Sequence, residues 1–212
     1  MTVLEIDTPH GPARAHLHAA GDPVGALVLG HGAGGGVEAA DLVAVTDVGV
    51  SAGFSVALVE QPYRVAAGRR SPAPAGQLDA AWTAVVSRLR GDELSGLPMI
   101  AGGRSAGARV ACRTAAETGA VAVLCLAFPL HAPGRAATGK TRQPELDAVA
   151  VPCLVVQGRS DPFGMPRASS TRTVVEVEGN HSLKTDLDAV AAAVREWLSK
   201  LRTSAAAARS PR

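Results

Sequence analysis

The sequence contains few aromatic residues, and this shortage limits how its core can be built. Phe, Trp and Tyr make up 3% of the 212 residues, whereas hydrophobic residues as a group make up 47%. The core must therefore consist of Val, Leu, Ile and Ala, as in a buried parallel sheet covered by helices. The hydrophobic content also excludes a wholly disordered chain. The length suits one large domain with a sizeable core.

The sequence also has no large excess of positive or negative residues. Lys and Arg total 21 against 19 Asp and Glu, which gives a net charge of +2. This near balance predicts no general attraction to nucleic acid or to an anionic membrane. No apolar run approaches the roughly 20 residues of a membrane span. Residues 1–10 lack the basic start and apolar centre of a signal peptide.

Cysteine is scarce, and its placement argues against disulfides and zinc. Cys112, Cys125 and Cys153 are an odd number of thiols in apolar surroundings, and no Cys/His cluster has zinc spacing. We therefore expect reduced core thiols, a cytoplasmic location, and no metal or cofactor.

Apolar runs that look like strands alternate with helical patterns along the chain. Strands are predicted at Val3–Ile6, Ala13–His18, Ala26–Leu29, Ser55–Glu60, Leu97–Ala101, Val121–Phe128, Cys153–Gln157 and Thr173–Val177. Helices are predicted at Val37–Ser51, Gln77–Arg90, Ala106–Thr118 and Leu187–Leu201. This alternation predicts an α/β fold with a mostly parallel central sheet and helices on both faces. We expect a single domain over residues 1–202 and a disordered C-terminal tail over 203–212.

The strongest chemical motif is the sequence Gly103-Arg104-Ser105-Ala106-Gly107, a G-x-S-x-G between a predicted strand and a predicted helix. Its two glycines permit a sharp turn that lifts a serine oxygen above the sheet. The alternative is a glycine-rich turn in which the serine only caps the helix. The strand and helix around the motif favour Ser105 as a nucleophile.

A serine nucleophile needs a base, and the base needs an acid to orient it. Asp161 and His181 each follow a predicted strand. Ser, then Asp, then His is the order expected in this kind of sheet. Taken singly, Asp161 could be a turn residue and His181 a surface histidine. Their order and their placement at strand ends predict a triad of Ser105, Asp161 and His181.

The run His31-Gly32-Ala33-Gly34-Gly35-Gly36 follows an early strand and could supply backbone N–H groups to an oxyanion. We expect the oxyanion hole to be formed by the N–H groups of Ala33 and Ala106, with Gly32 and Gly34 as alternatives to Ala33. A flexible turn or a phosphate-binding loop would be the other interpretation. The run lacks the G-x-G-x-x-G spacing and the downstream acid of a dinucleotide site.

Residues 134–141, with the sequence GRAATGKT, formally match the phosphate-binding motif G-x-x-x-x-G-K-T. That motif requires a strand before it and a helix that starts at the lysine. Pro129 and Pro133 separate the run from its strand, and Pro144 falls inside the required helix. We interpret the match as chance. The alternative, a nucleotide-dependent enzyme, predicts thermal stabilisation by ATP.

Basic residues follow the strand that ends at Glu60, namely Arg64, Arg69 and Arg70. They could hold an anionic group of a substrate or partner. The alternative, which we favour slightly, is that they pair with Glu60 or Asp79 and pack through their stems. The residues expected to contact substrate are His31, Gly32, Gly34, Arg64 and Arg104.

Together the motifs resemble the α/β-hydrolase superfamily over nearly the whole chain. The strings that carry the resemblance are His31-Gly32-Ala33-Gly34-Gly35, Gly103-Arg104-Ser105-Ala106-Gly107, Asp161-Pro162 after Gly158, and Gly179-Asn180-His181. The chain looks most like the small, capless, dienelactone-hydrolase-like branch. The strings Gln61-Pro62-Tyr63-Arg64, residues 68–74 (GRRSPAP) and Phe128-Pro129-Leu130-His131 are similar to a group that includes a testis-expressed hydrolase-like protein and a subunit of a chromatin acetyltransferase complex.

The resemblance implies a Ser105 nucleophile, a His181 base and an Asp161 orienter. Dienelactone hydrolases carry cysteine as the nucleophile, so their substrate is not carried over. We expect no cap domain, because no long helical segment lies between Phe128 and Val151. The predicted activity is acyl-enzyme hydrolysis of small esters or thioesters by a monomer or homodimer. The alternative is a non-catalytic binding or scaffold protein on the same fold.

Overall fold

The computed structural model describes residues 1–66, 71–132 and 141–209. Its strands are β1 (Thr2–Ile6), β2 (Ala13–His18), β3 (Gly25–Gly30), β4 (Phe54–Glu60), β5 (Met99–Arg104), β6 (Ala122–Leu126), β7 (Cys153–Gly158) and β8 (Arg172–Val177). Its helices are α1 (Ala40–Ser51), α2 (Pro62–Val65), α3 (Ala75–Gly91), α4 (Ala106–Thr114), α5 (Gln143–Asp147) and α6 (Leu187–Arg209). Every predicted strand and helix has a counterpart among them.

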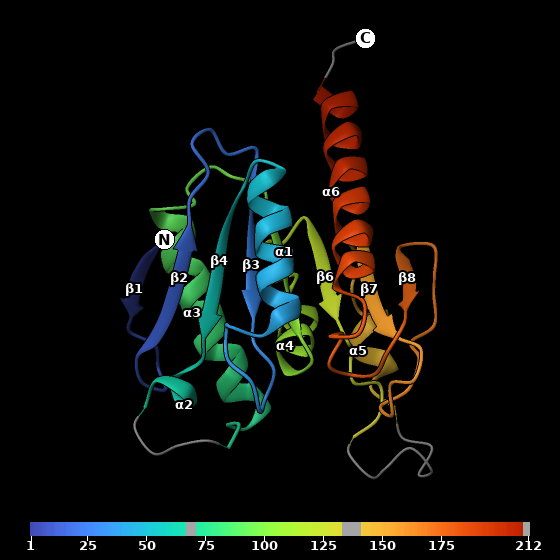
Figure 1. The fold of residues 1–212 in the computed structure, drawn as a ribbon. Helices are drawn as coiled ribbons and strands as arrows, with labels where there is room; N and C mark the ends of the chain where they lie inside the picture. Colours follow the sequence, from blue (N-terminus) through green and yellow to red (C-terminus); the bar gives the residue numbers. More distant parts are fainter. Residues whose placement is uncertain (67–70, 133–140, 210–212) are drawn as a thin grey trace.

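The strands form one eight-stranded sheet in the order β1-β2-β4-β3-β5-β6-β7-β8. The β1–β2 and β2–β4 pairs are antiparallel, and the pairs from β4 through β8 are parallel. The mostly parallel sheet is therefore confirmed, with an antiparallel hairpin at one edge. In such a sheet, a ligand site lies where the parallel strands end. These ends lie at the lower edge of the sheet in Figure 1.

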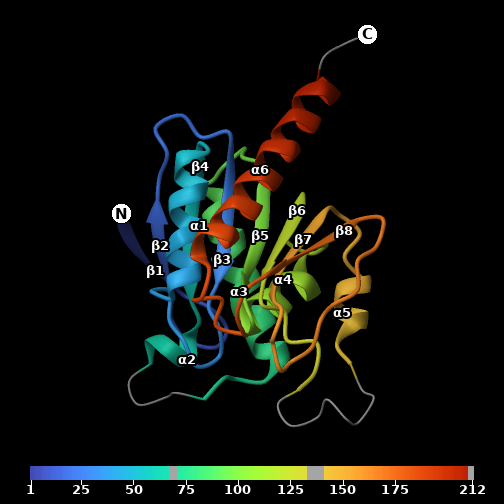
Figure 2. The ribbon, with the colours of Figure 1, turned by 45° about the vertical axis from the view of Figure 1, so that its right-hand side comes forward.

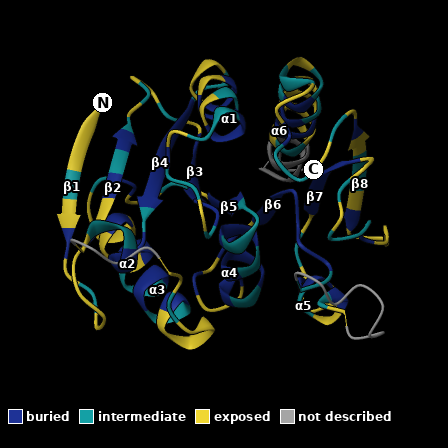
Figure 3. Ribbon diagram, turned by 60° about the horizontal axis from the view of Figure 1, so that its bottom comes forward, coloured by how far each residue is buried: buried dark blue, intermediate teal, exposed yellow. Residues whose placement is uncertain are grey.

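Helices cover both faces of the sheet, as Figures 2 and 3 show. Helices α1 and α6 pack together on one face, and α3 and α4 pack together on the other. Two apolar clusters fill the space between the sheet and these two layers. Strands β3 and β7 are buried along their whole length, which explains why their sequences show no polar alternation.

Helix α3 illustrates how the local pattern determines the packing. Its buried residues, Leu78, Ala81, Trp82, Val85, Val86 and Leu89, recur every three or four positions. This spacing places them on one helical stripe that faces the sheet. Trp82 is fully buried, and its ring lies 3.4 Å from where a β-carbon on Gly30, the last residue of β3, would stand.

Three features of the fold differ from the sequence analysis. Helix α6 continues to Arg209, where we expected a disordered tail from residue 203, because the alanine-rich run has a strong intrinsic preference for helix. The short helices α2 and α5 were not predicted. Each carries proline in its first turn, where the missing N–H group costs no intrahelical hydrogen bond. Among the described residues between Phe128 and Val151, α5 is the only helix.

The three cysteines lie in the interior of the protein. All three thiols are free and buried, and the Sγ atoms of Cys112 and Cys125 lie 3.5 Å apart. Hydrogen bonding between the thiols, followed by burial, raises the pKa of Cys125 well above its usual value, so this thiol stays protonated. No described helix combines the length and apolar character needed to cross a membrane.

The turn between β5 and α4 is pressed against β3, and this contact leaves no room for side chains. A β-carbon on Gly103 or on Gly107 would overlap the carbonyl oxygen of Gly30. Gly103 also has a φ of 156°. Glycine is thus required here by the approach of two backbones rather than by a loose turn.

We predict that Gly107→Ala lowers the unfolding free energy by about 1–3 kcal/mol, because overpacking forces the backbone to move. Gly76→Ala is the matched control. Gly76 is also helical, but a β-carbon there would meet no atom within 4 Å. The control should gain about 0.5 kcal/mol through lower entropy of the unfolded chain. Urea unfolding of both variants measures the difference, and equal stabilities would contradict the close contact.

Candidate active site

Ser105 lies at the junction of β5 and α4, at the edge where the parallel strands end. Its backbone has φ 53° and ψ −105°, in a region that residues with a β-carbon rarely adopt. Its N–H group donates to the carbonyl oxygen of Leu126 at 2.9 Å, which holds the turn against β6. A strained turn at the start of a helix places the side chain above the sheet, next to helical N–H groups without acceptors in the helix.

His181 and Asp161 complete a continuous hydrogen-bonded chain with Ser105. The Ser105 Oγ lies 2.9 Å from His181 Nε2, and His181 Nδ1 lies 2.8 Å from Asp161 Oδ2. An ionised carboxylate only accepts hydrogen bonds, so Nδ1 carries the ring proton and the serine hydroxyl donates to Nε2. The Asp161 side chain is 1% exposed and that of His181 is 18% exposed. The structure therefore brings together the three residues that the sequence analysis selected.

Asp161 and His181 are held by residues that the sequence analysis did not select. Gln157 Nε2 donates to Asp161 Oδ2 at 2.8 Å, and the N–H of Phe163 donates to Asp161 Oδ1 at 2.8 Å. The Phe163 ring packs edge-on against the imidazole, with centroids 4.4 Å apart. Both oxygens of the Asp161 carboxylate thus accept hydrogen bonds, and the Phe163 ring packs against one side of the imidazole. The sequence signal that could have found Gln157, which is fully buried, was a polar residue at the end of an apolar strand.

The glycine-rich loop lies beside Ser105. A β-carbon on Gly32 would come within 3.6 Å of the Ser105 β-carbon. The Tyr63 hydroxyl donates to the Ala33 carbonyl oxygen at 3.3 Å. Burial raises the pKa of Tyr63 to about 12, against the opposing charge of Arg64, so the hydroxyl keeps its proton. Helix α2 thereby fixes the segment that carries the expected oxyanion donor Ala33.

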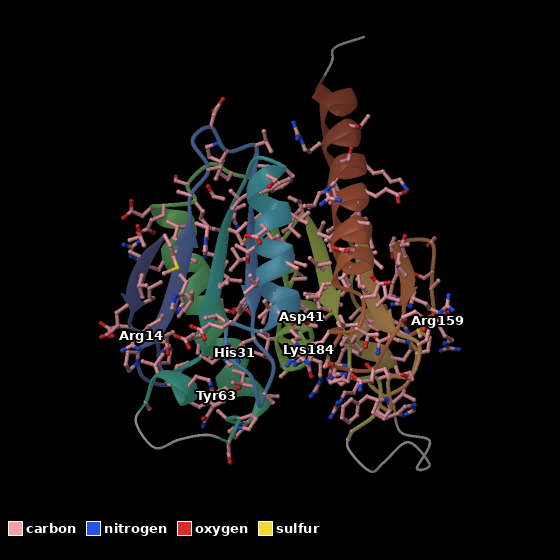
Figure 4. All side chains as sticks on the ribbon, viewed as in Figure 1. Arg14, His31, Asp41, Tyr63, Arg159 and Lys184 are labelled. Atoms are coloured by element: carbon pink, nitrogen blue, oxygen red, sulfur yellow. The ribbon has the colours of Figure 1, made fainter. Side chains whose placement is uncertain are left out.

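His31, which we expected to contact substrate, is a buried residue at the base of the glycine loop. Its side chain is buried, with 2% exposed. Its Nδ1 lies 2.8 Å from the Gly32 carbonyl oxygen, and its Nε2 accepts the N–H of Gln61 at 3.1 Å. The ring is therefore a neutral Nδ1–H tautomer, and burial lowers its pKa in agreement with this state. These two contacts fix the base of the glycine loop, and Figure 4 places His31 near Tyr63 at the lower edge of the sheet.

Arg104 also turns inward, and it connects three segments of the site. Its Nε lies 3.0 Å from Asp41 Oδ2, at the start of α1. Its Nη2 donates to the carbonyl oxygen of His181 at 3.1 Å. A β-carbon on Gly32 would lie only 2.8 Å from Nη1, so the guanidinium packs directly under the glycine loop. Arg104 thus spans the nucleophile turn, the histidine loop and the glycine loop.

The remaining residues that the sequence analysis singled out lie in different surroundings. Arg64 pairs with neither Glu60 nor Asp79, because Glu60 contacts His16 and Asp79 contacts Arg113. Gly34 faces open space, with no atom within 4 Å of a β-carbon. Ala106 is the first residue of α4. Arg69, Arg70 and most of the run 134–141 lie outside the described residues.

Comparison with known proteins identifies the family of this architecture. A family model described as "Alpha/beta hydrolase domain" matches residues 23–206. No curated protein matches the chain. The resemblance to the testis-expressed group stays a prediction, because none of the structures compared below is described as a member of it.

Solved structures with the same fold are distant in sequence. Est1E from Butyrivibrio proteoclasticus, with ferulic acid bound, has a TM-score of 0.78 at 18% identity, covering 93% of this chain and 98% of that one. A serine hydrolase "without lid" from Xanthomonas campestris has a TM-score of 0.72 at 18% identity, covering 94% of each chain. A dienelactone hydrolase from Anabaena variabilis has a TM-score of 0.72 at 18% identity, covering 94% of this chain and 96% of that one.

We predict that Arg104→Met lowers the unfolding free energy by about 3 kcal/mol, because Asp41 would remain as a buried carboxylate without its cation. Burial raises the pKa of Asp41 even with Arg104 present. Without Arg104 the pKa of Asp41 should rise further, so the loss relative to wild type should shrink as the pH falls from the variant's pKa towards that of the wild type.

The control is Arg88→Met, since Arg88 pairs with Asp92 and Glu93 at the surface and should contribute less than about 1 kcal/mol. The double variant Arg104→Met with Asp41→Asn should recover part of the loss in denaturant unfolding. A double variant as unstable as Arg104→Met alone would show that the ion pair is not the cause.

Proposed function

The chain belongs to the alpha/beta hydrolase domain family, and from this premise we propose that it is a serine hydrolase of small carboxylic esters or thioesters. The observation that carries the proposal is the chain of hydrogen bonds from the Ser105 hydroxyl through His181 to Asp161. A serine hydroxyl is a weak nucleophile until a positioned base accepts its proton. A serine hydrolase and an esterase domain among the solved structures of the same fold support this reading.

In the proposed reaction, Ser105 Oγ attacks the substrate carbonyl carbon while its proton passes to His181 Nε2. Asp161 stabilises the resulting imidazolium through Nδ1–H. The backbone N–H groups of Ala33 and Ala106 receive the negative charge that develops on the carbonyl oxygen. Their support is their placement, on the loop beside Ser105 and at the first position of α4.

The tetrahedral intermediate then collapses, and the bond to the leaving alcohol or thiol breaks as this group takes the proton from Nε2. Water enters next and gives a proton to His181 as it attacks the acyl-enzyme. The second collapse returns the proton to Ser105 Oγ and releases the carboxylic acid. No net proton or electron is gained by the protein in one cycle.

Small, accessible substrates fit the open site. Among the described residues, the segment between Phe128 and Val151 contributes only the five-residue α5 over the strand ends, rather than a helical cap. The one-domain organisation over 1–202, the cytoplasmic location and the monomeric or homodimeric state stay predictions from the sequence.

We expect Ser105→Ala to abolish turnover of 4-nitrophenyl acetate while leaving the unfolding free energy nearly unchanged or higher, because functional strain is maintained at a cost in stability. A fluorophosphonate probe, which bonds to an activated serine, should label the wild type and Ser95→Ala but not Ser105→Ala. Ser95 is exposed on the surface and serves as the matched control. A folded wild type that neither turns over esters nor takes the probe would support the scaffold alternative.

Asp161→Asn should lower kcat by about 10⁴-fold, because the amide favours the imidazole tautomer that cannot accept the serine proton. The control Asp22→Asn makes the same chemical change at an exposed loop position and should keep full activity. Steady-state kinetics on the same ester measure both. An Asp161→Asn enzyme within tenfold of wild type would remove Asp161 from the triad.

A further inference from the structure

Strand β7 carries a buried amide at the end of an otherwise apolar row of side chains. Cys153 and Val155 belong to the apolar cluster that contains the buried residues of α3 and α4. Alternate residues of a strand face the same side of the sheet, so Gln157 continues this row. Its side chain is fully buried. Burying an amide costs free energy unless hydrogen bonds satisfy it, so its partners indicate its role.

The nitrogen of this amide lies among three oxygen atoms. Gln157 Nε2 lies 3.1 Å from the Phe128 carbonyl oxygen, 2.8 Å from Asp161 Oδ2 and 2.9 Å from the Gly164 carbonyl oxygen. Its Oε1 is buried and has no hydrogen-bond partner among the described residues. Rotation of the amide by half a turn would place Oε1 against three acceptors, so the donor end determines its orientation. The side chain therefore serves as a donor, at the cost of an unsatisfied acceptor.

The donor restrains the Asp161 carboxylate at the oxygen that meets the proposed base. Asp161 Oδ2 accepts from both Gln157 and His181 Nδ1, whereas Oδ1 accepts the N–H of Phe163. The final torsion of an aspartate side chain is broad, and a donor on each oxygen restricts it. Gln157 also donates to the carbonyl oxygen of Gly164, which follows Phe163. One amide thus holds Asp161 directly and restrains the segment that carries its second donor.

The absence of charge on this donor suits the proposed reaction. Asp161 must keep its negative charge in order to stabilise the imidazolium of His181. A neutral N–H group favours the ionised carboxylate without cancelling that charge. A lysine at the same place would oppose the imidazolium, and an ionised carboxylate would repel Asp161. An amide is the side chain that supplies the hydrogen bond alone.

We propose that Gln157 is a positioning residue of the hydrolase, and that its neutral donor holds Asp161 in the orientation in which Oδ2 meets His181 Nδ1. The inference rests on the proposed serine-hydrolase activity and adds a fourth side chain to its machinery. Because Gln157 is fully buried, it acts through Asp161 and not on the substrate.

The first test removes the donor without adding charge. Gln157→Met should lower kcat for 4-nitrophenyl acetate by about 10- to 100-fold, because a misplaced catalytic group costs rate, and KM should change by less than about twofold. Gln143→Met is the matched control. Gln143 is also buried, and its Nε2 donates to a different carboxylate, Asp147 Oδ1, at 2.9 Å. This control should keep the wild-type kcat.

The second test restores the donor through pH. In Gln157→Glu, two carboxyl groups lie within hydrogen-bond distance, so the pair retains one proton to a higher pH than usual. Phe163 and His181 donate to Asp161 and favour its ionised form, so the introduced carboxyl holds the proton. The protonated group donates to Asp161 as the amide does, and this donor is lost when the group ionises.

The measured quantity is the ratio of kcat/KM in Gln157→Glu to that in the wild type, from about pH 5 to about pH 9. The ratio should be close to one at the acid end and fall at least about tenfold as the pH rises. Asp161 and His181 titrate in both proteins. The His131 ring, which lies against Gly164, and the Arg142 guanidinium, which donates to the His131 carbonyl oxygen, are also common to both. Their own titrations therefore cancel in the ratio.

The outcomes separate this inference from the proposed function. Turnover by Gln157→Met within about threefold of wild type, or a Gln157→Glu ratio that is as flat with pH as that of Gln143→Glu, overturns the positioning role and leaves the hydrolase intact. An equal loss of kcat in Gln143→Met also overturns it. If urea unfolding shows that neither Gln157 variant folds, the amide is required by the fold and the positioning role fails. A wild type that neither hydrolyses the ester nor takes the fluorophosphonate probe overturns the hydrolase and the positioning role together.

Discussion

The backbone contact at Gly30 is the constraint on which the site depends. The start of α4 approaches β3 so closely that Gly103 and Gly107 cannot carry β-carbons. This approach places the turn that holds Ser105 directly beside the segment that leaves β3, which is the glycine loop. The nucleophile and the loop are therefore neighbours because two backbones touch, before any side chain contributes. A larger residue in that contact would separate them and would also disturb the packing of the sheet.

Buried polar groups then fix loops that the backbone contact brings near one another. The Arg104 guanidinium donates to the carbonyl oxygen of His181 and pairs with the carboxylate of Asp41. His31 and Tyr63 form hydrogen bonds that hold the glycine loop. Each of these groups loses hydration when buried, so each must be satisfied within the protein. The resulting network restricts the loops to one arrangement. The site can in this way keep an ordered geometry with no helical cap over it among the described residues.

The sequence predicted the fold and the three residues of the hydrogen-bonded chain because their signals are local. Ser105, Asp161 and His181 each follow a strand, and in a parallel sheet the ends of neighbouring strands meet at one edge. The partners of side chains could not be predicted in the same way. His31 was expected to touch substrate, yet the N–H of Gln61 and the Gly32 carbonyl oxygen occupy its ring nitrogens. Such pairings depend on side-chain directions that strand order alone does not specify.

Arg104 and Arg64 show how ion pairing determines the surroundings of a charged side chain at this site. Arg64 and Arg104 were both predicted from the sequence to contact substrate, but the structure places them in different surroundings. Arg104 meets Asp41 in a buried pair and so becomes part of the scaffold. Arg64 finds its nearest sequence candidates taken, since Glu60 turns to His16 and Asp79 turns to Arg113. Arg64 packs against the glycine loop at Gly36 and forms no ion pair within the described residues. The different surroundings of the two arginines therefore arise from which carboxylates the fold places beside them, and not from the arginines themselves.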